Sequence, residues 1–138
     1  MATLTWGPSL KVGFGDIDVQ HQRLVALVNQ LEDGIEGGRS REMLADVLRD
    51  LVRYTQLHFA YEEKLMERYN ITESDEHRAQ HNRLTDDVIA FQKRYEAGEE
   101  ELETELLDFL GAWLRGHILG SDRELAAKLI AAGADSAA

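Results

Sequence analysis

The sequence predicts an all-α fold: an up-down-up-down antiparallel four-helix bundle with an irregular N-terminal arm and a short C-terminal helix. Residues that favour helices (Leu, Ala, Glu and Arg) are abundant, and the 138 residues include a single proline. Apolar residues recur at helical spacing in four long stretches. The connections between these stretches are short, which favours antiparallel neighbours. A hydrophobic content of 43% is enough for one core, so we expect a single domain over residues 1–138.

Residues 1–17 show no helical period and are expected to form the arm, with Trp6, Val12 and Phe14 packing on the bundle. The bundle is expected over residues 18–130. Asp16 or Asp18 is a candidate N-cap for its first helix. The inward stripe of that helix comprises His21, Leu24, Val25, Val28, Leu31 and Ile35, and Gly34, Gly37 and Gly38 are expected to end it.

Ser40 is expected to cap the second helix, roughly residues 41–69. Thr72 or Ser74 is expected to cap the third, which Gly98 closes. The fourth helix is expected to begin near Glu100. We expect Gly120-Ser121 to interrupt it, with Ser121 and Glu124 forming a capping box for the last short helix. Residues 131–138 are small and are expected to form a frayed tail.

Composition excludes several classes of function. The formal net charge of −11 repels phosphate backbones and anionic lipid surfaces, so neither nucleic acid nor a membrane is an expected partner. The chain has no cysteine, so any metal must be held by nitrogen and oxygen. No apolar run is long enough to span a bilayer, and the N-terminus does not resemble a signal peptide. We therefore expect a cytoplasmic protein.

All five histidines fall on core-facing stripes of the four helices. They are His21, His58, His77, His81 and His117. One histidine on an apolar face is usually a satisfied core residue, but five from four helices are difficult to satisfy without a common partner. The pattern favours a metal site.

Two acids accompany the histidines. Glu62 follows His58 by four residues and therefore shares its helical face, whereas Glu63 is rotated away and is expected to be solvated. Asp122 follows His117 by five residues, which on a continuous α-helix points it off that face. The interruption at Gly120-Ser121 is expected to re-aim it.

Other templates fit worse. No histidine has a glutamate three residues before it, as ferritin-like di-iron sites require. The His-Glu-x-x-His pattern of zinc proteases is absent, as are a phosphate-binding glycine loop and a serine or cysteine nucleophile motif.

The order of motifs resembles the hemerythrins, in particular the single-domain bacterial hemerythrins. The motifs are Leu4-Thr5-Trp6, Ile17-Asp18-x-Gln20-His21, His58-Phe59-x-x-Glu62-Glu63, His77-x-x-x-His81 and Trp113-Leu114-x-x-His117-Ile118-x-x-x-Asp122. They cover almost the whole chain.

The resemblance implies a non-haem, oxo- or hydroxo-bridged centre of two iron ions that binds O2 reversibly. Carried over, His77, His81 and His117 hold one iron, and His21 and His58 hold the other. Glu62 and Asp122 bridge the pair, which leaves an open position for O2 on the iron with two histidines. Iron accepts imidazole and carboxylate ligands.

Four apolar residues near the ligands are expected to line the O2 pocket: Phe59, Trp113, Leu114 and Ile118. Leu114 resembles the family position that lines this pocket. Ordinary core packing is the alternative role for all four.

The sequence thus predicts an O2 carrier, store or buffer that is not an enzyme and is monomeric. Three rivals stay open. One is an O2 or redox sensor acting through a separate partner. Another is a di-iron enzyme acting on peroxide or nitric oxide, or weakly as an oxidase or peroxidase. The third is a structural zinc or manganese site.

Overall fold

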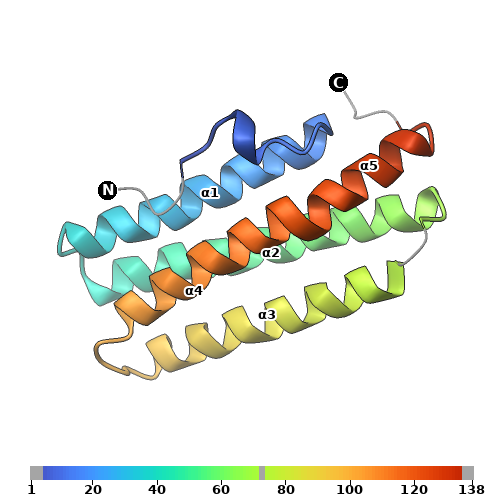
Figure 1. Cartoon of the computed structure of the whole chain (residues 1–138). Coiled ribbons are helices and arrows are strands. Elements are labelled where there is room, and N and C mark those ends of the chain that lie inside the picture. The colour runs from blue at the N-terminus through green and yellow to red at the C-terminus, as the bar shows by residue number, and fades with distance from the viewer. Residues whose placement is uncertain (1–4, 72–73, 135–138) are drawn as a thin grey trace.

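The computed structural model describes residues 5–71 and 74–134, and in these residues all regular structure is helical. The main helices are α1 (Gly15–Glu36), α2 (Arg41–Arg68), α3 (Ser74–Glu96) and α4 (Glu103–Gly116). A π-helical turn, η2 (His117–Asp122), joins α4 to α5 (Arg123–Ala131). Figure 1 shows α1, α2 and α3 lying side by side with the long α4–α5 rod, as the predicted four-helix bundle requires. None of the described helices is long and apolar enough to cross a membrane.

The predicted helix ends were right at some positions and wrong at others. The Ser40 side chain accepts a hydrogen bond from the Met43 N–H and so caps α2 as predicted. Gly98 follows α3 with a φ of 91°, a left-handed conformation that favours glycine. The fourth helix begins at Glu103 rather than near Glu100. Of the two predicted caps for α3, Thr72 lies outside the described residues, and Ser74 is the first residue of the helix.

Gly34 does not end the first helix, contrary to the prediction, but lies within α1. A Cβ at this position would meet the Leu44 Cδ2 atom at 2.7 Å. The glycine therefore allows α1 and α2 to approach closely just before the chain turns between them.

Neither Asp16 nor Asp18 caps α1, which begins at Gly15 without a side-chain cap. Asp18 instead accepts hydrogen bonds from the backbone N–H groups of Val12 (2.7 Å) and Gly13 (3.2 Å), both in the arm. The arm includes a short 3-10 helix, η1 (Pro8–Leu10), so it is more regular than predicted. Phe14 is buried, and Trp6 and Val12 pack on the core as expected.

These contacts make Asp18 an anchor of the arm. We expect Asp18→Ala to lower the free energy of unfolding by about 1–2 kcal/mol, because two hydrogen bonds to a charged acceptor are lost at a partly exposed position. Urea unfolding checks this, with Asp50→Ala at an exposed position of α2 as the control. Equal stabilities of the two variants would show that Asp18 does not anchor the arm.

Candidate metal centre

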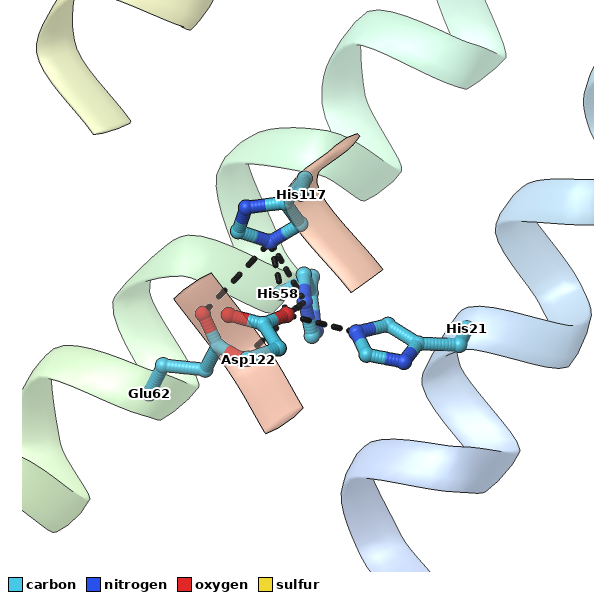
Figure 2. A group of neighbouring side chains, drawn as sticks. All are labelled: His21, His58, Glu62, His117 and Asp122. Atoms are coloured by element: carbon cyan, nitrogen blue, oxygen red, sulfur yellow. Dashed lines mark hydrogen bonds and ion pairs between the residues drawn. The ribbon is translucent and has the colours of Figure 1, made fainter. Parts of the chain in front are cut away.

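Seven polar side chains converge in the middle of the bundle. His21 comes from α1, His58 and Glu62 from α2, His77 and His81 from α3, and His117 and Asp122 from the two ends of η2. Figure 2 shows five of them, with Asp122 facing the rings of His21, His58 and His117. Six are buried, and the side chain of His77 is 11% exposed. The structure thus brings together all seven residues singled out in the sequence.

The π-helical turn explains how Asp122 joins this group. In an α-helix, a residue five positions on is rotated by about 140° from the starting face. A π-helix pairs residues five apart, as an α-helix pairs residues four apart, so the later residue lies on nearly the same face as the earlier one. His117 and Asp122 are the first and last residues of η2 and therefore face the same side.

Asp122 points into the site as predicted, but the predicted cause, a break in the helix, was wrong. Gly120-Ser121 does not break the helix, and α5 continues directly from η2 with no side-chain cap. Ser121 therefore forms no capping box with Glu124. Its hydroxyl donates a hydrogen bond to Gln80 Oε1 and ties η2 to α3.

All five histidines direct Nε2 toward the carboxylates. Two of them are fixed from behind through Nδ1. His58 Nδ1–H donates to Gln20 Oε1 at 2.6 Å, and His81 Nδ1–H donates to Glu63 Oε2 at 3.0 Å. With the proton on Nδ1, the lone pair of Nε2 points into the cluster, as a metal ligand requires.

Sequence reasoning missed these two supporting residues. It placed Glu63 in solvent, whereas the side chain is one-third exposed and bound to His81. Gln20 was noted only as part of a motif. Supporting acceptors are a general requirement of histidine ligands. Which histidine each acceptor meets depends on how α1 and α3 pack against α2, which helical periodicity does not encode.

Each of the two buried carboxylates turns its oxygens toward different histidines. Glu62 Oε1 lies 3.0 Å from His81 Nε2, and Glu62 Oε2 lies 3.3 Å from His58 Nε2. Asp122 Oδ2 lies 2.6 Å from His21 Nε2, while its Oδ1 lies 3.4 Å from His77 Nε2. Each acid therefore faces histidines from two different helices.

The candidate ligand atoms form two groups within which all atoms lie within 4.8 Å of one another. One group comprises His21, His58, Glu62, His117 and Asp122, and the other comprises Glu62, His77, His81 and Asp122. The two carboxylates belong to both groups. The His117 ring is nearly equidistant from the histidines of each, with centroids 5.5 Å from His58 and 5.4 Å from His81.

The protonation states of these groups also fit a metal site. Burial lowers the pKa of His58 to about 4 and that of His81 to about 2, which keeps both imidazoles neutral and able to act as ligands. Burial, and next the nearby Asp122 charge, raise the pKa of Glu62. Burial alone would raise the pKa of Asp122, but the neighbouring His117 and His21 hold it well below its usual range.

Several buried atoms in the cluster have no hydrogen-bond partner in the described part of the chain. The Nδ1 atoms of His21 and His117 are among them. Those directed into the cluster are both carboxylate oxygens of Glu62, Asp122 Oδ1, and the Nε2 atoms of His77 and His81. Buried polar atoms are usually paired, and unpaired ones are destabilising. A pair of cations bound between the two carboxylates would satisfy the atoms directed into the cluster together. The residues present therefore fit a di-metal site.

The apolar residues predicted around the site are buried, but they contact it differently. The Phe59 ring stacks on His81 with centroids 3.9 Å apart, and Trp113 lies nearly parallel to His117 at 6.3 Å. Leu114 and Ile118 are fully buried in the main apolar core. A surface pocket of about 160 Å³ between α2, α3 and α5 reaches the site at His77.

The fold and the side chains together define a four-helix-bundle protein with a buried histidine–carboxylate site suited to two metal ions. The chain belongs to the hemerythrin family, because residues 12–129 match the Hemerythrin HHE cation binding domain.

Curated relatives agree with this assignment. The chain is 38% identical to a bacteriohemerythrin of Pseudomonas aeruginosa over 88% of this chain and 78% of the relative. It is 32% identical to the bacteriohemerythrin of Methylococcus capsulatus over 89% and 94% of the two chains. A crystal structure of wild-type hemerythrin superposes with a TM-score of 0.84 at 29% identity, covering 91% of this chain and 97% of that one.

Proposed function

We propose that this protein binds O2 reversibly at a di-iron centre and acts as an oxygen carrier, store or local buffer rather than as an enzyme. The observation that carries the proposal is the cluster of five histidines with two buried carboxylates that belong to both ligand groups, in a chain of the hemerythrin family. Nitrogen and oxygen ligands of this kind suit iron. The bound iron pair would supply the electrons that hold O2.

We assign His77, His81 and His117 to one iron, His21 and His58 to the other, and Glu62 and Asp122 to both. The two-sided arrangement of each carboxylate supports the bridging role. The ligand atom of His117 groups with those of His21 and His58, but its ring centroid lies as close to His81 (5.4 Å) as to His58 (5.5 Å). Its assignment beside His81 therefore follows the family pattern. The iron held by two histidines would then have one protein ligand fewer than the other, and O2 would bind there.

The surroundings of the site favour binding over turnover. Phe59 and Trp113 place aromatic rings against His81 and His117, and Leu114 and Ile118 add fully buried aliphatic groups to the core. Apolar side chains cannot donate a proton to a reduced oxygen ligand, and they exclude the water that would displace it.

The decisive experiment is the visible absorption spectrum of the iron-loaded protein, recorded anaerobically after reduction and again after O2 is admitted. We expect colour to appear with O2 and to fade when O2 is removed. A stable oxidised spectrum without fading would contradict reversible binding and favour the enzyme on peroxide or nitric oxide. Metal analysis showing zinc or manganese in protein isolated from its native source would favour a structural site.

Leu114 offers a test of the apolar pocket. It lies one helical turn before His117 and is fully buried. We expect Leu114→Ala to enlarge the pocket and admit water, which would shorten the lifetime of the oxygenated form several-fold. The measurement is the autoxidation rate after a single exposure to O2.

Leu110→Ala is the matched control, because Leu110 is equally buried on α4 and lies a further turn from His117. Both truncations should destabilise the bundle by about 2–5 kcal/mol. Only Leu114→Ala should shorten the lifetime. Equal autoxidation rates in the two variants would show that Leu114 is only a core residue.

A further inference from the structure

His58 and His81 differ in the residue that accepts the hydrogen bond from Nδ1. His58 Nδ1–H donates to the neutral amide oxygen of Gln20, whereas His81 Nδ1–H donates to the carboxylate of Glu63. Both histidines are buried, and both direct Nε2 toward Glu62. The two rings therefore have the same role in the site but different electrostatic support.

A carboxylate behind an imidazole makes that imidazole a stronger donor. Its negative charge draws the Nδ1 proton toward itself and raises the electron density available at Nε2. A neutral amide orients the ring without adding charge. His81 should therefore donate more strongly to a metal than His58, and the nearby charge should favour the more oxidised state of that metal.

The position of Glu63 supports this role. Its side chain is only one-third exposed, so water screens its charge less than at an open surface. Its second oxygen, Oε1, lies 3.9 Å from Arg78 Nε. Arg78 is on α3, one turn before His81, and it also lies 3.6 Å from the exposed Asp75. Glu63 is thus held between the His81 ring and the Arg78 guanidinium, both of which belong to α3.

We propose that Glu63 is a positioning residue that strengthens metal binding through His81 and lowers the reduction potential of the metal bound there. Gln20 orients His58 without this effect, so the two metals are supported unequally. The proposal takes iron and its ligands from the proposed function. The part of the test that measures metal affinity does not depend on O2 binding.

Glu63→Gln tests the proposal, because glutamine keeps the size of the side chain and an acceptor for His81 but removes the charge. We expect the affinity for one of the two metal ions to fall by about 10–100-fold, as for other residues that support metal ligands. Competition with a coloured chelator, using Fe²⁺ and separately Co²⁺, measures this. The reduction potential of the iron-loaded protein should rise.

The reciprocal variant is Gln20→Glu, which places a carboxylate behind His58. We expect it to lower the reduction potential, opposite in sign to Glu63→Gln. A merely structural disturbance would not shift the reduction potential in opposite directions when the charge is removed in one variant and added in the other. Glu67→Gln is the control, because Glu67 is an exposed carboxylate one turn further along α2. It should change neither quantity.

Chemical unfolding of the metal-free variants shows whether each has folded like the parent. Within folded variants, the proposal is overturned if Glu63→Gln leaves both affinity and potential at the values of Glu67→Gln, or if both charge changes shift the potential in the same direction. Failure of the proposed function would look different. The parent itself would then lack a reversible spectral change with O2, while the Co²⁺ affinities would still rank the variants.

Discussion

Replacing Glu62 with alanine should abolish binding of the metal pair. Glu62 is fully buried, and its two oxygens face histidines of both groups. Removing it takes one ligand from each metal. We therefore expect a loss of affinity greater than the roughly 10–100-fold typical of supporting residues. Iron analysis after anaerobic loading and desalting should give fewer than two ions per chain, and retained two-iron stoichiometry would refute the bridging role.

Glu62→Gln separates metal loss from misfolding. Glutamine keeps the volume of the side chain but cannot carry the charge that burial and Asp122 oppose. The metal-free form of this variant should therefore be at least as stable as the metal-free parent, yet fail to bind two ions. Glu67→Ala, an exposed position on the same helix, should leave stoichiometry unchanged.

Removing the metals from the parent should lower its stability strongly. Without them, the cluster retains buried atoms with no partner, including both oxygens of Glu62. An ion present at about 1,000 times its dissociation constant adds about 4 kcal/mol to the free energy of unfolding. We expect a loss of at least this size when a strong chelator removes both ions, measured by urea unfolding under anaerobic conditions.

The Glu62→Ala variant provides the control for this experiment. Because it should hold no metal pair, chelator should change its unfolding midpoint much less than that of the parent. Re-addition of Fe²⁺ should restore the parent but not the variant. Equal midpoints of the parent with and without chelator would show that metal binding is not coupled to the stability of the bundle.

The sequence alone determined the fold class and the composition of the site. Helical periodicity assigned each histidine to an inward stripe, and the four-residue spacing of His58 and Glu62 placed both on one face. These are local properties, because positions on a single regular helix follow from its period. The absence of cysteine restricted the ligands to nitrogen and oxygen.

Tertiary structure decided what local periodicity could not. Asp122 faces the site because the chain forms a π-helical turn at His117–Asp122. From the sequence, Gly120-Ser121 had indicated a break in the helix instead. Asp18 anchors the arm rather than capping α1, because its carboxylate accepts hydrogen bonds from the N–H groups of Val12 and Gly13 in the arm. Glu63 reaches His81 only because α2 and α3 pack together. Contacts between helices depend on the rotation and separation of whole elements, which the period of one helix does not specify.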